Sequence, residues 1–485
     1  MAKLTEISRL LGAPIEEKFH SANVDGVTCR SSECRPGIIF AALRGETADG
    51  HEFAADAYKN GARAFILEHS VALPPDAAEI IVPDARAALS KVSLLLCCDP
   101  HKKLKIIGVT GTKGKSTVVH IIKRILDASE NNAAEISTVG FSLNGGFEPT
   151  LNTTPESDVI AKYLRRAADA GEKCAVIEVS SQGIKQKRVD AIDFDVGVLT
   201  NISRDHIGKG EHGSFAEYKN CKKEFISRAK TKILNADDRY FSEFSCENAV
   251  TYGINSPADV VAGNIKIVQR DGAFRSEFDV TYKGQTVKTS IDIPGIFAVY
   301  DALAAISACL SLGVTLDKCC EAIAGVSVPG RFEKIETERD IDVVIDYAHN
   351  GDSMKNALIA ARELSKGRVI CVFGSVGGRT KMRRAALGRV ADKYADLCIV
   401  TSDNPNFENP IDICEDIAIN IKRAQCKVIP DREEAIRYAV DIAEDGDFLL
   451  VAGKGHEKYQ QIGGKKIPFD EREIIRSASK IKTKI

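Results

Sequence analysis

The sequence predicts an α/β protein built from three modules. Apolar segments such as residues 105–110, 174–180 and 342–347 alternate with amphipathic helical patterns, which is typical of parallel sheets. Two polar breaks that contain proline, at residues 99–103 and 328–331, divide this alternation. With 485 residues the chain is also longer than one hydrophobic core usually serves. The predicted domains are residues 1–102, 103–329 and 330–485.

The order of elements differs between the modules. The first hundred residues alternate short apolar runs with helical patterns, which predicts an N-terminal α/β domain. The central module predicts a doubly wound sheet, and its residues 258–293 switch to the period-two alternation of an antiparallel patch. The C-terminal module predicts a second, Rossmann-like sheet. Its expected strands are residues 342–347, 368–374, 397–402, 426–429 and 447–453.

Composition excludes several classes of protein. The formal net charge of −2 provides no basic surface for nucleic acid. The N-terminus lacks the apolar core of a signal peptide, and no run approaches the ~18 apolar residues of a membrane span. We therefore expect a cytoplasmic monomer without membrane insertion. The 14 cysteines form no C-x-x-C pair, so we expect reduced thiols and no zinc site, with Cys97/Cys98 and Cys319/Cys320 in helices.

A glycine-rich loop between a predicted strand and helix is the strongest local signal. Such a loop directs backbone N–H groups at phosphates, with Lys115 reaching the β and γ oxygens and the Ser116 hydroxyl available to Mg²⁺. The segment from Gly108 to Gly114 is one residue longer than the standard pattern, so a plain glycine turn with a surface lysine stays an alternative. The expected ATP-binding residues of this loop are Gly111, Thr112, Lys113, Gly114, Lys115, Ser116 and Thr117.

The loop in its T-G-T-x-G-K-S form resembles that of the Mur ligase family. In the N-terminal module, residues 36–42 and 49–53 are similar to the UDP-binding domain of MurE-type enzymes, which add the third amino acid to UDP-MurNAc-dipeptide. The D-S-R of the family reads Arg30-Ser31-Ser32 here, so the resemblance retains Ser31 as a UDP-substrate residue. As bare sequence, the P-G and D-G dipeptides of this region also fit simple turns.

Further matches in the central module imply contacts to a UDP-linked substrate. Residues 152–155 (N-T-T-P) are similar to the family segment that meets the sugar diphosphate, although they could also cap a helix. The family has histidine and alanine where this chain has Gln182-Gly183. The residues that the resemblance implies for the substrate are Asn152, Thr153, Thr154, Ser180 and Arg188.

The same resemblance implies a Mg²⁺ site. Glu178 ends an apolar strand, where doubly wound sheets bind ligands. Residues 200–206 match the family's T-N-L-S-R-D-H, which makes His206 a ligand of a second metal ion. The family carbamylates a lysine that aligns with Lys222, and Lys219 and Lys223 are close enough for an error of register. The implied metal ligands are Ser116, Glu178, His206 and carbamylated Lys222.

Three residues are implied for the rest of the ATP molecule. Arg331 follows the second break and is expected to stabilise charge on the γ-phosphate. Asp346, in a D-Y-A-H string, is expected to accept hydrogen bonds from the ribose. Asp301 replaces an asparagine of the family's F-N-x-x-N, so the adenine contacts must differ.

A last group of residues is implied for the incoming amino acid. Family members that use meso-diaminopimelate carry D-N-P-R, and its arginine pairs with the far carboxylate of that amino acid. Here the string ends at Asn406, which would leave that carboxylate unpaired, so an amino acid such as L-lysine is favoured. The implied residues are Arg379, Asp403, Asn404, Asn406, Gly453 and Glu457.

Together these motifs predict an ATP-dependent ligase that forms an amide bond through an acyl phosphate. Its catalytic residues would be Lys115, Glu178, His206, Lys222 and Arg331. Two alternatives stay open. One is a MurE-like ligase of archaeal pseudomurein or of another pathway outside peptidoglycan, and the other is a nucleotide-binding scaffold without catalysis.

Overall fold

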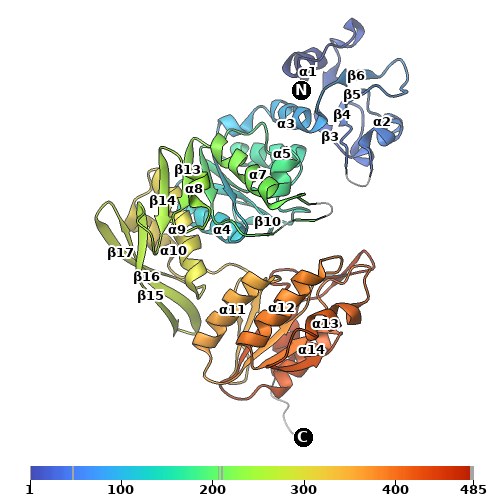
Figure 1. Ribbon diagram of the computed structural model, residues 1–485. Coiled ribbons are helices and arrows are strands. Elements are labelled where there is room, and N and C mark those ends of the chain that lie inside the picture. Colours follow the sequence, from blue (N-terminus) through green and yellow to red (C-terminus); the bar gives the residue numbers. More distant parts are fainter. Residues whose placement is uncertain (1, 46–47, 206, 209–210, 481–485) are drawn as a thin grey trace. The chain divides into compact units, whose positions relative to one another are not determined.

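The computed structural model describes residues 2–45, 48–205, 207–208 and 211–480 (Figure 1). The chain forms two compact units. Unit 1 contains Met1–Val260 and Leu303–Cys319, and unit 2 contains Val261–Ala302 and Cys320–Ile485. The predicted boundaries at 102/103 and 329/330 stay a prediction.

The N-terminal part of unit 1 holds a four-stranded sheet in the order β3-β4-β5-β6, and every neighbouring pair is parallel. Leu4 and Ile7 on one face of α1 join its core, and Gly12 ends that helix in the left-handed conformation. The elements are β1 (Ala2–Lys3), α1 (Leu4–Leu11), β2 (Asn23–Val24), β3 (Gly26–Thr28), β4 (Ile38–Ala41), α2 (Ala54–Lys59), β5 (Ala64–Leu67), β6 (Ala78–Ile81) and α3 (Ala85–Leu96).

The central sheet of unit 1 has the strand order β10-β9-β8-β11-β7-β12-β13-β14. Along the order β8-β11-β7-β12-β13-β14 every neighbouring pair is parallel. Strand β9 is antiparallel to β8, and β10 is antiparallel to β9. Because β7 lies between β11 and β12, the chain order reverses there, and such a switch point is where doubly wound sheets bind ligands. The strands are β7 (Lys105–Thr110), β8 (Ala133–Ile136), β9 (Phe141–Leu143), β10 (Gly146–Glu148), β11 (Cys174–Glu178), β12 (Val196–Leu199), β13 (Thr231–Asn235) and β14 (Ala249–Gly253). The helices are α4 (Lys115–Ala128), α5 (Ser157–Asp169), α6 (Ser181–Lys185), α7 (Phe215–Arg228) and α8 (Phe241–Phe244).

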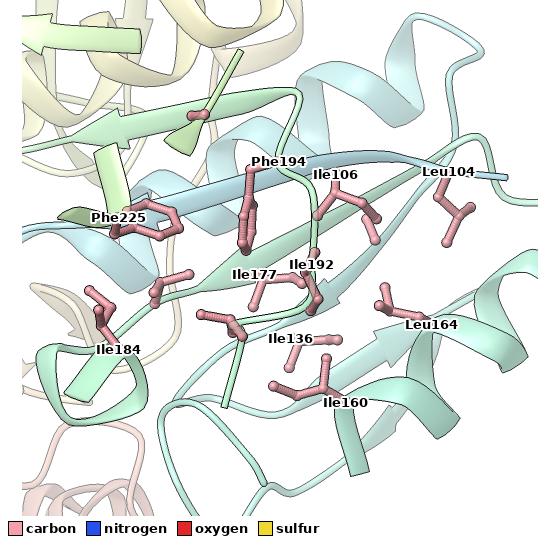
Figure 2. Close-up of a cluster of buried hydrophobic side chains, with 14 of the residues drawn as sticks. Leu104, Ile106, Ile136, Ile160, Leu164, Ile177, Ile184, Ile192, Phe194 and Phe225 are labelled. Atoms are coloured by element: carbon pink, nitrogen blue, oxygen red, sulfur yellow. The ribbon is translucent and has the colours of Figure 1, made fainter. Parts of the chain in front are cut away.

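Buried apolar side chains from the sheet and from α5 and α7 form the core that carries this switch point (Figure 2). Ile136 and Ile177 from the strands pack with Ile160 and Leu164 of α5. Each fully buried side chain of this size contributes about 1.5–3 kcal/mol. The core therefore fixes the strand ends on which the candidate site is built.

Unit 2 combines an antiparallel strand group with a second doubly wound sheet. Strands β16 and β17 are antiparallel, which confirms the predicted switch in periodicity. The C-terminal sheet has the order β18-β19-β23-β20-β21-β22, and only β18 is antiparallel to its neighbour. The strands are β15 (Val260–Arg270), β16 (Ala273–Tyr282), β17 (Gln285–Ile291), β18 (Glu333–Ile335), β19 (Asp342–Asp346), β20 (Val369–Phe373), β21 (Leu397–Val400), β22 (Gln425–Val428), β23 (Phe448–Ala452), β24 (Tyr459–Ile462) and β25 (Lys465–Pro468). The helices that follow β17 along the chain are α9 (Ile296–Ser311), α10 (Leu316–Ile323), α11 (Gly351–Leu364), α12 (Lys381–Tyr394), α13 (Pro410–Ala418), α14 (Arg432–Ile442) and α15 (Glu471–Ser479).

Some local features differ from the sequence predictions. The hairpins β9–β10 and β24–β25 were not expected. Cys97 and Cys98 lie beyond the end of α3 rather than inside a helix, because Cys98 and Asp99 both adopt positive φ angles that a right-handed helix excludes. Cys319 and Cys320 lie in α10 as expected.

Candidate active site

The phosphate loop consists of the four residues between the end of β7 at Thr110 and the start of α4 at Lys115. Gly111 has φ +146°, and a Cβ atom there would lie 1.9 Å from Thr200 Oγ1. Gly114, the residue before α4, has φ +82°. Both positions therefore require glycine.

Gly108, the first glycine of the motif, belongs to the strand before the loop. It lies inside β7, where a Cβ atom would be 2.5 Å from the ring of Phe225 and 2.6 Å from that of Phe194. This glycine makes room for the core and is no part of the loop. The two glycines of the loop itself, Gly111 and Gly114, are separated by two residues, so the loop does not have the four-residue spacing of the standard pattern.

The polar side chains of the loop are held by the chain itself. Lys115 Nζ donates to the carbonyl oxygens of Gly111 and Thr112, each at 3.2 Å. Lys113 donates its backbone N–H to Asn201, and its Nζ lies 2.6 Å from Asp205 Oδ2. Lys115 therefore lies folded over the backbone that a phosphate would contact.

Glu178 connects the loop to the neighbouring strand. The parallel register pairs Glu178 with Val109, which brings the end of β11 beside the loop. Its Oε2 accepts hydrogen bonds from Ser116 Oγ at 2.9 Å, Thr138 N at 2.8 Å and Thr138 Oγ1 at 2.9 Å. A hydroxyl and a carboxylate within one hydrogen bond form a hard oxygen donor set, which fits the ligand preference of Mg²⁺.

Lys222 faces the same loop from α7. It is 1% exposed, and its Nζ donates to Gly111 O at 2.8 Å and Thr110 Oγ1 at 3.2 Å. Burial, followed by repulsion from Lys115, holds the pKa of the Lys222 amine well below its usual value. Among the three lysines in question, Lys219 pairs with Glu243 and Lys223 is exposed. The geometry therefore favours the register that places Lys222 at the site.

Tyr218 braces this arrangement one helical turn before Lys222. Its hydroxyl is hydrogen-bonded to Thr112 Oγ1 at 2.9 Å, and the Lys222 Nζ lies 4.8 Å from its ring centroid. The sequence prediction did not include Tyr218. His206, predicted as a metal ligand, lies outside the described residues.

Four of the predicted UDP-substrate residues lie together around the backbone of Glu178. Thr154 Oγ1 donates to Glu178 O at 2.8 Å and lies within hydrogen-bond distance of the Ser180 hydroxyl at 3.0 Å. Arg188 donates to Thr154 O at 2.8 Å and pairs with Glu156 at 2.7 Å. Thr153 joins them through Thr138, because the hydroxyl oxygens of the two threonines lie within hydrogen-bond distance at 3.0 Å.

Two further residues were predicted for the UDP-substrate. Asn152 directly precedes Thr153 and is exposed on the loop between β10 and α5. Ser31 belongs to a short 3-10 turn between β3 and β4, and its carbonyl accepts a hydrogen bond from Asn60 Nδ2 at 2.9 Å.

In unit 2, Arg331 lies among aromatic and acidic side chains. Its guanidinium carbon is 4.8 Å from the ring centroid of Tyr347, which in turn lies 5.0 Å from the ring of His456. Burial, followed by the positive charge of Arg331, lowers the pKa of His456 to about 4. The imidazole is therefore neutral at physiological pH.

Of the two carboxyl groups predicted for the nucleoside, Asp301 is buried and Asp346 is partly buried in the same unit. Burial raises the pKa of Asp301 and Asp346, and the charge of Arg331 opposes both shifts. Asp346 accepts the backbone N–H groups of Phe332 and Ala348, each at 2.7 Å. Asp346 thus fixes the turn on which Arg331 lies, a contact that the sequence prediction did not include.

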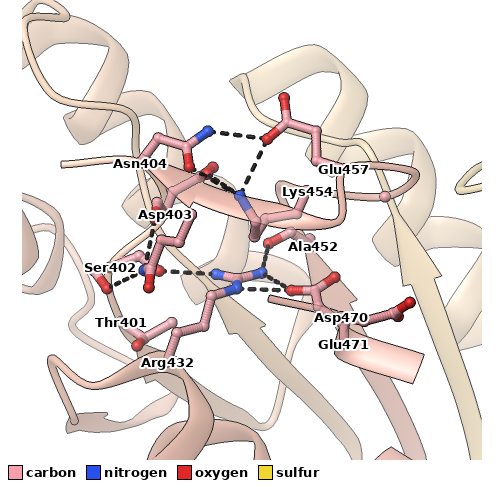
Figure 3. A network of polar contacts seen from close by, with 12 residues as sticks. Thr401, Ser402, Asp403, Asn404, Arg432, Ala452, Lys454, Glu457, Asp470 and Glu471 are labelled. Atoms are coloured by element: carbon pink, nitrogen blue, oxygen red, sulfur yellow. Dashed lines mark hydrogen bonds and ion pairs between the residues drawn. The ribbon is translucent and has the colours of Figure 1, made fainter. Parts of the chain in front are cut away.

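The predicted amino-acid site of unit 2 is built on a buried polar network (Figure 3). Lys454 is completely buried, and its Nζ donates to Asn404 Oδ1 at 2.9 Å and to Glu457 Oε2 at 3.1 Å. Asn404 Nδ2 donates to the same Glu457 oxygen at 2.9 Å. Gly453 has φ +124°, and a Cβ there would lie 2.8 Å from Asp403 Oδ2. The structure therefore brings Asp403, Asn404, Gly453 and Glu457 together.

Asn406 and Arg379 lie at the edge of this network. Asn406 has φ +56°, and its backbone N–H donates to Gln461 O at 3.0 Å while its carbonyl accepts from Gly463 N. The hairpin β24–β25 therefore holds the loop by main-chain atoms. Arg379 is exposed in the turn before α12, where the adjacent Gly378 N donates to Glu408 at 2.9 Å.

Sequence reasoning missed several residues of these networks. Lys454 stands inside the G-K-G-H-E motif, so its position was available as a signal. Thr138, Arg432 and Glu471 carry no local signal, because their partners come from distant segments of the chain.

The fold and the phosphate loop define a nucleotide-dependent α/β enzyme of several modules. Family models match the chain in three places: the Mur ligase family catalytic domain at residues 23–94, the Mur ligase middle domain at residues 109–309, and the Mur ligase glutamate ligase domain at residues 330–455. The chain belongs to the Mur ligase family. It is an ATP-dependent ligase of the acid–amino-acid type, as predicted.

Relatives extend over almost the whole chain. The UDP-N-acetylmuramoyl-L-alanyl-D-glutamate–2,6-diaminopimelate ligase of Caldanaerobacter subterraneus subsp. tengcongensis is 41% identical over 462 residues, which cover 94% of this chain and 95% of the relative. The enzyme of the same name from Geobacillus thermodenitrificans is 38% identical, with 98% and 99% covered. A solved structure of a ligase with this name superposes with a TM-score of 0.69 at 27% identity, covering 97% of this chain and 98% of that one.

Solved structures with lower sequence identity to this chain support only the assignment of its fold. MurF ligase from Thermotoga maritima in complex with ADP gives a TM-score of 0.65 at 20% identity, covering 88% of this chain and 94% of that one. Along the described part of the chain, no helix combines the length and the apolar character that a membrane span requires.

Proposed function

We propose that this ligase adds an amino acid to UDP-MurNAc-L-alanyl-D-glutamate for cell-wall synthesis. The names of its relatives supply the substrate. The observation that carries the proposal is the convergence of Lys115, Ser116, Glu178 and Lys222 on one phosphate loop. A hydroxyl, a carboxylate and two lysines around one phosphate position suit transfer of a phosphoryl group between anions.

In the proposed reaction, the terminal carboxylate of the substrate attacks the γ-phosphate of ATP and forms an acyl phosphate with release of ADP. The amine of the amino acid then attacks the acyl carbon, and phosphate leaves as the amide bond forms. Lys115 and Arg331 are proposed to neutralise charge on the phosphoryl group. Mg²⁺ would be held by Ser116 and Glu178, with His206 and carbamylated Lys222 as further ligands, and it would screen repulsion between the two anions.

Substrate binding is proposed for the residues that surround Glu178 and for Ser31. Thr153, Thr154, Ser180 and Arg188 offer hydroxyl groups and a cation, which suit a diphosphate. Asp301 and Asp346 are proposed to contact the nucleoside of ATP. The cytoplasmic location and the monomeric state expected from the sequence stay predictions.

The identity of the amino acid depends on position 406. An asparagine side chain cannot form the two parallel bonds with which arginine binds a carboxylate. We therefore propose an amino acid without a second carboxylate, such as L-lysine. The names of the relatives favour meso-diaminopimelate instead, which makes this amino acid the second candidate.

The experiment that tests the proposal measures ADP, phosphate and product mass for the purified enzyme with UDP-MurNAc-dipeptide, ATP and Mg²⁺. L-lysine and meso-diaminopimelate are supplied in separate reactions. A higher kcat/KM for L-lysine is expected, and a higher value for meso-diaminopimelate contradicts the assignment of the amino acid. Turnover with neither amino acid favours a ligase of another pathway, and no nucleotide turnover with any acceptor favours a scaffold without catalysis.

A further inference from the structure

A buried ion pair lies beneath the predicted amino-acid site. Arg432, the first residue of α14, and Glu471, the first residue of α15, are both completely buried. Arg432 Nε donates to Glu471 Oε1 at 2.7 Å (Figure 3). A buried pair of this kind costs desolvation free energy, so its value to the protein lies in the geometry that it enforces.

The other two guanidinium nitrogens bridge separate strands. Nη1 donates to Ser402 O at 3.1 Å and Nη2 donates to Ala452 O at 2.8 Å. Ser402 follows β21 and Ala452 ends β23, and these strands are not neighbours because β20 lies between them. Arg432 thus fixes the distance between two strand ends that no ladder of backbone hydrogen bonds connects directly.

The residues that follow these two carbonyls are those predicted to bind the amino acid. Asp403 and Asn404 come directly after Ser402, and Gly453 follows Ala452. The planar guanidinium has donors in fixed directions, so it sets the relative position of both loops at once.

The network combines two cations with three acidic side chains. Arg432 and Lys454 are buried cations, and Asp403 and Glu471 are buried acids. Glu457, whose side chain is 14% exposed, is the remaining acid and lies nearest to solvent. With Arg432 in place, Lys454 is held by Asn404 and Glu457 at 2.9 and 3.1 Å, whereas its distance to Asp403 is 3.8 Å.

We propose that Arg432 is a positioning residue for the amino-acid site: it joins the ends of β21 and β23 and neutralises the acids beneath them, so that Lys454 holds Asn404 and Glu457 in place. This inference rests on the proposed function for the role of the site, but the positioning itself is a property of the free protein. Because its side chain is completely buried, Arg432 acts through its neighbours.

The test compares three variants with the wild type. Arg432→Met removes the bridge, Arg432→Lys keeps the charge without the planar donors, and Arg437→Met is the control. Arg437 lies on the same helix and pairs with Glu433, but both side chains are nearly half exposed. Arg432→Met is expected to raise the KM for the amino acid about tenfold or more while the KM for ATP changes less than about twofold. Arg432→Lys should fall between Arg432→Met and the wild type, and Arg437→Met should match the wild type.

Equal changes in both KM values, or unchanged kinetic constants in a destabilised variant, would overturn the inference. Should Arg432→Met fail to fold, Arg432→Lys carries the test alone, because it keeps the positive charge and loses the planar donors that bridge the two strand ends. The KM for the amino acid is then expected to rise more than the KM for ATP. Equal changes in the two values would overturn the inference.

Hydrogen exchange separates a failure of the inference from a failure of the proposed function. In the free enzyme, segments 402–406 and 453–457 are expected to exchange about tenfold faster in Arg432→Met than in Arg437→Met. Unchanged exchange overturns the positioning role whatever the substrate is. Faster exchange in Arg432→Met supports the positioning role even where the wild-type enzyme ligates neither amino acid. That second result refutes the proposed function alone.

Discussion

Replacement of Lys222 by alanine gives the sharpest test of the phosphate-binding region. The neutral amine is the form that combines with CO₂, and the lowered pKa of Lys222 provides it at pH values where a free lysine is charged. The two hydrogen bonds that Lys222 donates to Gly111 O and Thr110 Oγ1 are worth about 1 kcal/mol each. Loss of the group proposed to hold Mg²⁺ at the reacting phosphate costs about 2.7–4 kcal/mol more. The sum, about 5 kcal/mol, corresponds to a decrease in kcat of about 10³–10⁴-fold.

The assay is ADP formation that depends on the amino acid, measured for Lys222→Ala and for Lys223→Ala. Lys223 is adjacent in sequence but exposed, so its replacement is expected to leave the rate within about twofold. Added formate or acetate should restore part of the Lys222→Ala activity, since a small carboxylate can occupy the place of the carbamate. Equal rates for the two variants would refute the reasoning. Full activity of the wild type in CO₂-free buffer would show that Lys222 acts as an unmodified amine.

Three further predictions concern other parts of the site. Lys115→Ala should lower ADP formation by at least about 10²-fold, because it removes the cation of the phosphate loop, and undiminished ADP formation would contradict the whole assignment. His456 has a pKa of about 4 in the folded protein instead of its usual 6.5. As the pH falls from 6.5 to 4, this histidine is protonated in the unfolded chain but not in the folded protein, so the folded state loses stability. The difference amounts to about 3 kcal/mol, and His456→Gln should show a smaller drop in Tm between pH 7 and pH 4.5 than the wild type, whereas an equal drop would rule out this account. Asn406→Arg should shift kcat/KM toward meso-diaminopimelate by about tenfold or more, at a cost of about 1–2 kcal/mol for a non-glycine side chain at positive φ, and an unchanged preference would remove position 406 from substrate choice.

The regular elements of the fold were predictable because their signals are local. The strands at residues 105–110 and 342–347 are apolar runs, and the structure has β7 and β19 at these positions. The hairpin β24–β25 was missed because its strands are polar and largely exposed, so only the Gly463-Gly464 turn marked it. A hairpin of this kind is visible in sequence only through its turn.

The candidate site shows a similar division between local and distant signals. The phosphate loop was identifiable from contiguous residues, but the choice of Lys222 over its neighbours depended on the family resemblance. The role of Arg432 could not be predicted from the sequence, because its hydrogen-bond partners are the carbonyl groups of residues 402 and 452 and the side chain of Glu471. Contacts between segments separated by tens of residues leave no pattern in a single sequence.

The way in which the hairpin β24–β25 holds residue 406 has an evolutionary consequence. Gln461 and Gly463 form hydrogen bonds with the peptide groups of Asn406, and every L-amino acid except proline carries the same N–H and C=O groups. The hairpin therefore does not depend on the identity of this side chain, and the positive φ of residue 406 is the remaining constraint on it. If position 406 selects the amino acid, as proposed above, single codon changes there would alter the substrate preference while the rest of the fold stays constant.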